Sequence, residues 1–191
     1  MNVDQARALM REWVGSESLR IHMESVAACV AAYARRLAPD QIDRWTVCGL
    51  LHDFDYERHP DKSEHPFVGV KEIERRGVDE EIRNAILGHA DYSGVPRVSP
   101  LAKALYACDE LAGFLVACAK VRPGGIGDLE PKSVKKKLKD RAFAAAVSRE
   151  DIARGIADLA PVCGVEPAAF ESEHFQTCIE ALRASRGPLG I

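Results

Sequence analysis

The sequence predicts an all-α protein. Apolar residues recur every three to four positions along nearly the whole chain, which is the spacing of helices that bury one face. No stretch alternates apolar and polar residues for long enough to form a sheet. The chain has 191 residues, 47% of them hydrophobic, which is enough to bury a sizeable core within one compact domain.

Helix-capping residues and prolines divide this pattern into segments. Asp40 and Asp79 are expected N-caps, Ser99-Pro100 begins a long helix, and Gly77 ends an earlier one. Loops are expected over 57–64 and 91–98. The expected helices cover residues 4–14, 19–37, 41–56, 66–76, 80–90, 99–120, 149–160 and 167–184.

A segment rich in glycine and proline, Gly124–Pro131, is the expected boundary within the chain. It separates a core, residues 1–123, from a C-terminal helical extension, residues 124–191, that packs on this core. A basic stretch over 132–141 follows, with five lysines and Arg141. Such a run is either a solvated helix face or a patch that binds an anionic substrate, and both interpretations stay open here.

The charge balance excludes several classes of protein. There are 26 basic and 29 acidic residues, a net charge of −3, whereas nucleic-acid polymers and anionic membranes attract proteins with a basic surplus.

No apolar run reaches the ~20 residues of a membrane span, and the N-terminus has no apolar secretion signal. The six cysteines form no CxxC pair, as expected for reduced thiols. We therefore expect a cytoplasmic protein.

Four ionisable side chains, His22, His52, His89 and Asp109, occupy helix faces that are otherwise apolar. A buried carboxylate without a partner costs several kcal/mol or becomes neutral. A single core histidine is usually just hydrogen-bonded, but four ionisable residues on four helices can satisfy one another at one point. A metal cation is the commonest means of doing so.

An adjacent pair, His52-Asp53, lies within the stretch GLLHDFDYE. Together with His22 and Asp109, this pair resembles the signature of the HD superfamily of metal-dependent phosphohydrolases: a histidine, a His-Asp pair and a distant aspartate on successive helices. The resemblance covers about residues 20–120. It implies a helical metal-binding core and a hydrolase that acts on phosphoesters.

A second group extends the resemblance. His65-Pro66 with Gly69 resembles the HPxxG element of binuclear HD families, including the HD-GYP phosphodiesterases, and His89 resembles the next histidine of that series. The resemblance implies a second ion held by His65 and His89, with Asp53 bridging the two ions. The alternative for His65 is an exposed helix cap.

The sequence also departs from the HD-GYP pattern. Ala90 stands where that family has a second consecutive histidine, and the loop over 91–96 is shorter, with Val95 in place of a tyrosine. Hydrolysis of cyclic di-GMP therefore does not transfer to this chain. His59 and His174 match no motif and are expected at the surface.

Three residues are the expected catalytic groups: Asp53, Asp55 and Lys62. Asp53 would orient the reacting water between the ions. Asp55 and Lys62 flank the ligands and could relay a proton or bind a phosphate oxygen. Solvated loop charges are the alternative for both.

The expected function is hydrolysis of a small phosphoester, a nucleotide or another phosphomonoester or diester. Mixed imidazole and carboxylate ligands favour one or two divalent transition ions, Mn, Fe, Ni, Co or Zn. The expected partner is a small phosphorylated substrate, with no nucleic-acid polymer and no membrane, and the oligomeric state is left open. The alternatives are an HD-type di-iron oxygenase, which uses the same ligands, and a regulatory binding module with a non-catalytic metal site.

Overall fold

The computed structural model describes residues 1–190, and all regular structure in this range is helical, as the sequence predicts. Short 3₁₀ turns cover Pro39–Gln41, Asp91–Ser93 and Gly125–Asp128. The α-helices are α1 (Val3–Trp13), α2 (Glu17–Leu37), α3 (Ile42–Leu51), α4 (Phe67–Arg75), α5 (Glu80–His89), α6 (Pro100–Lys120), α7 (Pro131–Leu138), α8 (Arg149–Leu159), α9 (Pro167–Ala184) and α10 (Arg186–Leu189).

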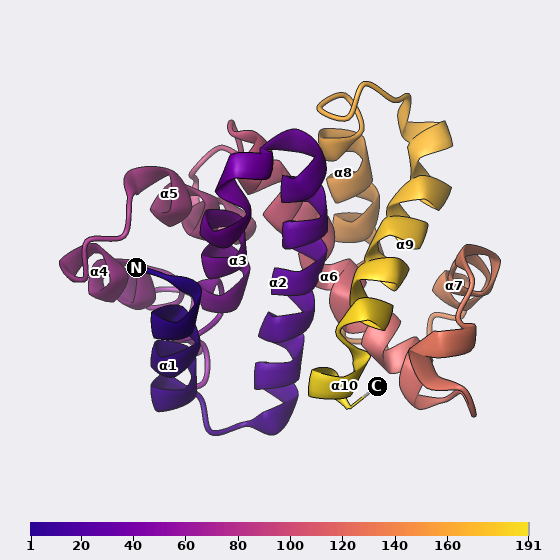
Figure 1. Ribbon diagram of the computed structural model, residues 1–191, viewed down its shortest axis with the longest axis horizontal. Coiled ribbons are helices and arrows are strands. Elements are labelled where there is room, and N and C mark those ends of the chain that lie inside the picture. The colour runs from indigo at the N-terminus through magenta and orange to yellow at the C-terminus, as the bar shows by residue number, and fades with distance from the viewer. Residues whose placement is uncertain (191) are drawn as a thin grey trace.

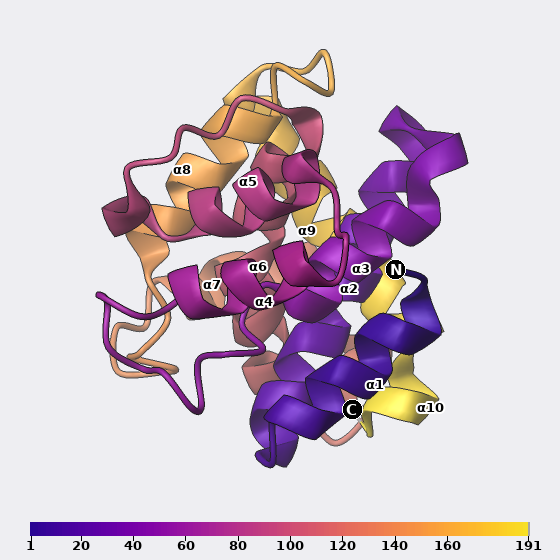
Figure 2. The ribbon, with the colours of Figure 1, turned by 90° about the vertical axis from the view of Figure 1, so that its left-hand side faces the viewer.

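Helices α2 and α6, of 21 residues each, form the centre of the fold. Figure 1 shows α1, α3, α4 and α5 on one side of α2, with α8, α9 and α7 on the other side and α6 behind. Figure 2 shows the molecule from the opposite side of α2 to α8 and α9, and α4 and α5 lie in front in this view. The buried core is continuous from the N-terminal helices to α8 and α9.

Two glycines allow helices to approach closely. A Cβ atom at Gly49 would lie 2.5 Å from the Cα atom of Ala27, so α3 packs directly on the backbone of α2. A Cβ atom at Gly155 would lie 2.6 Å from the Cα atom of Ala107, which gives α8 the same kind of contact with α6. These contacts fix α3 and α8 against the two central helices.

The predicted helix starts are confirmed for two of three caps. The side chains of Asp79 and Ser99 accept hydrogen bonds from backbone N–H groups in the first turns of α5 and α6. Gly77, at φ +75°, follows the end of α4 in the left-handed conformation that glycine tolerates. The prediction for Asp40 is wrong, because it lies in a 3₁₀ turn and Gln41 precedes α3.

The expected helix over 41–56 is wrong at its end. Helix α3 stops at Leu51, and turns follow through residue 58. In these turns the Glu57 carboxylate accepts hydrogen bonds from the backbone at the start of α2, and Arg58 donates to the last carbonyls of α1. These tertiary bonds replace the last turn of the helix.

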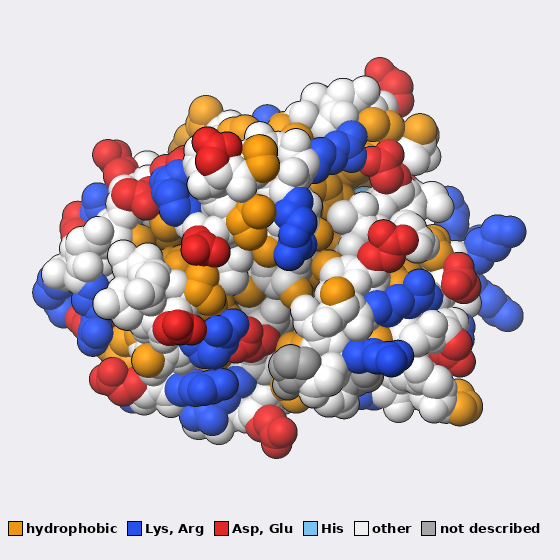
Figure 3. All heavy atoms as spheres, viewed as in Figure 1, with side chains coloured by type: hydrophobic (Ala, Val, Ile, Leu, Met, Phe, Trp, Pro, Cys, Tyr) orange, Lys and Arg blue, Asp and Glu red, His pale blue; other side chains and the backbone are white. Residues whose placement is uncertain are grey.

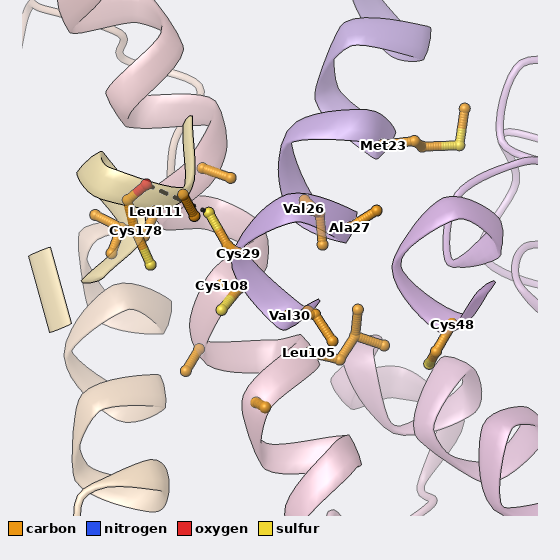
Figure 4. Close-up of a cluster of buried hydrophobic side chains, with 14 of the residues drawn as sticks. Met23, Val26, Ala27, Cys29, Val30, Cys48, Leu105, Cys108, Leu111 and Cys178 are labelled. Carbon is orange, nitrogen blue, oxygen red and sulfur yellow. Dashed lines mark hydrogen bonds between the residues drawn. The ribbon is translucent and has the colours of Figure 1, made fainter. Parts of the chain in front are cut away.

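The cysteines are free thiols, as predicted, and five of the six are buried. Figure 4 shows Cys29 of α2, Cys108 of α6 and Cys178 of α9 close together in the core. The thiol of Cys29 donates a weak hydrogen bond to the carbonyl oxygen of Cys178, at 3.8 Å. These small side chains let three helices meet at one point.

The prediction that His174 lies at the surface is wrong, because its side chain is fully buried in α9. Its Nε2–H donates to the carbonyl oxygen of Ala107 at 3.0 Å, and its Nδ1 accepts from the Tyr33 hydroxyl at 2.6 Å. Burial lowers the pKa of His174 to about 4. His174 therefore ties α9 to both central helices as a neutral imidazole.

Acidic and basic side chains are mixed over the face shown in Figure 3, with Lys and Arg side chains projecting beside α7 at its right edge. The basic stretch over 132–141 forms most of α7. Part of its charge is paired, since Lys135 contacts Glu171 and Lys137 lies 3.7 Å from Asp140. Within residues 1–190, no helix is both long and apolar enough to cross a membrane.

Candidate metal centre

All six predicted metal ligands meet at one point of the fold. They come from α2, from the turn after α3, from the residue pair before α4, and from α5 and α6. In chain order they are His22, His52, Asp53, His65, His89 and Asp109. Residues up to 87 positions apart in the sequence (109 − 22) are thus brought into contact.

Four of these residues, His22, His52, Asp53 and Asp109, form one group. The Nε2 atom of His22 lies 3.0 Å from Oδ1 of Asp109 and 3.2 Å from Nε2 of His52. The Nε2 atom of His52 lies 3.4 Å from Oδ1 of Asp109 and 3.4 Å from Oδ2 of Asp53. Gly113 of α6 faces the His22 ring, and a Cβ atom there would lie at an ordinary van der Waals distance, 3.6 Å, from its Nδ1 atom.

The second group forms on the other oxygen of Asp53. Its Oδ1 atom lies 3.2 Å from Nε2 of His89 and 3.4 Å from Nε2 of His65. The alternative of an exposed helix cap for His65 is excluded, because only 4% of this residue is exposed. One carboxylate therefore faces a different set of imidazoles with each of its oxygens.

Three of the four imidazoles are anchored through their second nitrogen. The Nδ1–H group of His52 donates to the carbonyl oxygen of Gly49, and that of His89 donates to the carbonyl oxygen of Ile86. The Nδ1–H group of His65 donates to the carboxylate of Asp55. This tautomer leaves each Nε2 lone pair directed inward, which is the arrangement of histidines that bind a metal ion.

These residues agree with a comparison against protein families. Residues 19–113 match the model of the HD domain. The chain belongs to the HD-domain superfamily. All six ligands lie inside the matched HD domain, whereas α7, α8 and α9 lie outside it. Searches of the curated proteins and of the solved structures gave no significant match.

The spacing of donor atoms in the HD domain fits divalent ions. Ligand atoms about 2.0–2.2 Å from an ion lie about 2.8–3.1 Å from their neighbours in octahedral coordination and about 3.3–3.6 Å from them in tetrahedral coordination. The N···O separations within the two groups run from 3.0 to 3.7 Å. His22, His52 and Asp53 form one set that could hold an ion, and Asp53, His65 and His89 form another.

The charges of the HD domain also favour a cation. Burial opposes charge on His52, but Asp53 and Asp109 overcome it and raise the pKa of the imidazole well above its usual range. The reciprocal contacts hold the pKa of both carboxyls below their usual range despite burial. The two buried carboxylates thus require nearby positive charge. It comes either from protons on the imidazoles or from divalent ions that displace these protons.

Asp55 lies behind the ligands rather than among them. Its side chain is 1% exposed, and its carboxylate accepts hydrogen bonds from Nδ1 of His65 at 2.8 Å and from the backbone N–H of Gly69 at 2.7 Å. A Cβ atom at Gly69 would lie 2.7 Å from the Asp55 carboxyl carbon, so only glycine fits here. The alternative of a solvated loop charge is therefore excluded for Asp55.

A cavity of about 540 Å³ opens over the ligands. Lys62 is exposed and lines this cavity, whereas the lysines of α7 do not. The wall also contains three tyrosines that the sequence pattern did not indicate, two from turns and one from α6: Tyr56, Tyr92 and Tyr106. Glu110 lines the wall too and was not predicted, and burial raises its pKa to about 7.

Proposed function

We propose that the protein is a metal-dependent hydrolase of a small phosphoester with a binuclear centre. The observation that carries this proposal is the position of the Asp53 carboxylate, whose two oxygens face two separate groups of imidazoles. A carboxylate with this disposition is suited to bridge two cations.

In this proposal His22, His52 and Asp109 hold the first ion, His65 and His89 hold the second, and Asp53 contributes to both. Divalent Mn, Fe, Co, Ni or Zn suits these ligands, and would polarise the phosphoryl group and acidify water. Hydrolysis forms a P–O bond to the water oxygen and breaks the bond to the alcohol, which leaves with a proton.

The predicted catalytic residues then have different tasks. Asp53 aligns the reacting groups through its contact with both ligand groups. Lys62, at the cavity wall, pairs with a phosphate oxygen and offsets its charge. Asp55 acts as a positioning residue, because its hydrogen bond fixes the tautomer and orientation of the His65 ring.

The test is Asp53→Asn, which keeps the size of the side chain and removes its charge. We expect this variant to lose bound metal and nearly all phosphoesterase activity, because a neutral amide cannot balance two cations. Elemental analysis gives the metal count, and a phosphoester panel with each candidate ion gives the activity. Asp61→Asn, in an exposed loop, is the matched control and should change neither.

Three results would contradict the proposal. Full metal content and full activity in Asp53→Asn would remove the metal centre from the mechanism. An iron pair with visible absorption and oxygen consumption, in a protein that hydrolyses no phosphoester, would favour the di-iron oxygenase. A metal-loaded protein with neither activity would favour the regulatory module.

A further inference from the structure

Tyrosines are concentrated at the cavity over the candidate metal centre. The whole chain has four tyrosines, and three of them line this cavity: Tyr56, Tyr92 and Tyr106. The fourth, Tyr33, is buried in the core with His174. The three residues come from separate segments of the chain, and the fold brings them to one cavity.

The three cavity tyrosines differ in how they are held. Tyr106 is buried, its hydroxyl donates to Asp151, and the Arg97 guanidinium lies 3.6 Å from its ring centroid. Tyr56 and Tyr92 are 47% and 44% exposed. Large hydrophobic side chains exposed to this degree are rare in the described chain, and two of them flank one cavity. Exposed aromatic rings at a cavity mark a binding surface.

Contacts of the two exposed rings place them beside the ligands. The ring of Tyr56 packs edge-on against the His65 imidazole, with 5.2 Å between centroids. The Nζ atom of Lys62 lies 5.4 Å from the ring centroid of Tyr92. Tyr92 lines the same cavity as His65 and His89. Both rings thus adjoin the point where a phosphoryl group would bind.

The charges of the cavity wall limit the length of a phosphate chain. Among the described residues that line the cavity, Lys62 alone carries a lysine or arginine side chain. The wall also holds the acidic residues Asp91, Glu110 and Asp151. Asp91 and Asp151 are both paired with Arg154, so Lys62 is the one lysine or arginine of the described wall that is available to a phosphate beyond the metal ligands. A di- or triphosphate would bring further negative charges for which this wall offers no second lysine or arginine.

We infer that the site takes a monophosphate ester whose alcohol part carries a flat aromatic ring, and that Tyr56 and Tyr92 are the residues that contact this ring. The inference rests on the proposed function for the position of the phosphate. Stacking on aromatic side chains is favourable for any flat ring, and edge or face contacts with tyrosine add to it. An aryl ester and a nucleoside monophosphate share this chemistry.

Binding is measured first, with phosphonates, whose C–P bond is not hydrolysed. The probes are naphthylmethylphosphonate, which carries a flat ring, and 3-hydroxypropylphosphonate, which does not. Calorimetry is carried out on the Mn-loaded full chain. We expect Tyr56→Ala and Tyr92→Ala each to weaken binding of the ring-bearing probe about tenfold, in the range of one lost stacking contact. Binding of the ring-free probe should stay unchanged.

Matched variants separate the ring from the hydroxyl. Tyr56→Phe and Tyr92→Phe keep the ring and should bind both probes as the unmodified protein does. Val121→Ala removes an exposed side chain that does not line the cavity and should have no effect. Hydrolysis then compares naphthyl phosphate and adenosine monophosphate with glycerol phosphate and adenosine triphosphate. Naphthyl phosphate and adenosine monophosphate should have a higher kcat/KM than the other two compounds. The comparison between them shows whether the site prefers an aryl ring or a nucleobase.

The possible failures are distinct. Equal binding of the two phosphonates, or ring binding that is insensitive to both alanine variants, would overturn the inference and leave phosphoester hydrolysis intact. A preference for adenosine triphosphate over the monophosphate would also overturn it. Ring-selective phosphonate binding in a protein that hydrolyses no ester would support the inference and contradict the proposed function instead.

Discussion

At the scale of single residues, the metal centre depends on side chains that never touch the metal. Asp55 is the clearest example, because both of its oxygens are occupied by N–H groups of His65 and Gly69. An asparagine there has only one acceptor oxygen, and its NH₂ group would face one of these two donors. The His65 ring would then lose its fixed orientation.

We therefore predict that Asp55→Asn weakens binding of the second ion about 10- to 100-fold and spares the first ion. Elemental analysis and metal titration by calorimetry give the number and affinity of bound ions. Glu64→Gln, an exposed carboxylate of the same segment, is the control and should bind both ions normally. Unchanged affinity for both ions in Asp55→Asn would refute the positioning role.

At the scale of helices, α9 is attached to α2 and α6 through a histidine that must stay neutral. Burial gives His174 a pKa of about 4 in the folded protein, against about 6.5 in an unfolded chain. Between these pH values the unfolded state binds a proton that the folded state does not. The contribution of neutral His174 to the unfolding free energy is therefore complete well above pH 6.5 and is lost as the pH falls toward 4.

The shift corresponds to about 3 kcal/mol of unfolding free energy lost by pH 4, and to about 2 kcal/mol at pH 5. His174→Gln keeps a donor for the Ala107 carbonyl and an acceptor for the Tyr33 hydroxyl, and does not titrate. We predict that from pH 7.5 to pH 5 the unmodified protein loses about 2 kcal/mol more stability than this variant. Urea unfolding of both proteins at both pH values provides the measurement. An equal loss of unfolding free energy in the two proteins would disprove the role of His174.

At the scale of the whole molecule, the core is large enough to fold without metal. Its buried side chains run from α1 to α9, and none of the six candidate ligands belongs to this apolar cluster. We predict that a chelator leaves the helical circular dichroism intact and lowers the melting temperature by about 5–10 °C, the effect of an ion present at 100 times its Kd. Loss of the helical signal on chelation would instead make the metal structural.

Much of this molecule was predictable because its helices bury one face and carry ordinary caps. The gathering of the candidate ligands was predictable because buried ionisable residues break the apolar pattern, as His89 and Asp109 do. His174 breaks it in the same way, between Phe170 and Cys178 on one helix face, but matched no motif and was misplaced. The end of α3 was not predictable, since the bonds of Glu57 and its neighbours are made to distant segments.

The short α10 was likewise not predicted. The division into residues 1–123 and 124–191 stays a prediction. Tyr56 and Tyr92 illustrate the general limit: they lie in turns, where no periodicity indicates which way a side chain points. Only the folded chain brings them to the same cavity.

The origin of the cavity wall has a consequence for how new specificities could arise. Every ligand comes from the HD domain, yet Ala146, Val147 and Asp151 of the wall come from the segment leading into α8 and from α8 itself. Part of the cavity wall is therefore encoded outside the stretch that encodes the candidate ligands and the two exposed tyrosines. Exchanging the stretch around 143–151 could reshape what enters the cavity while every group that binds metal is inherited unchanged.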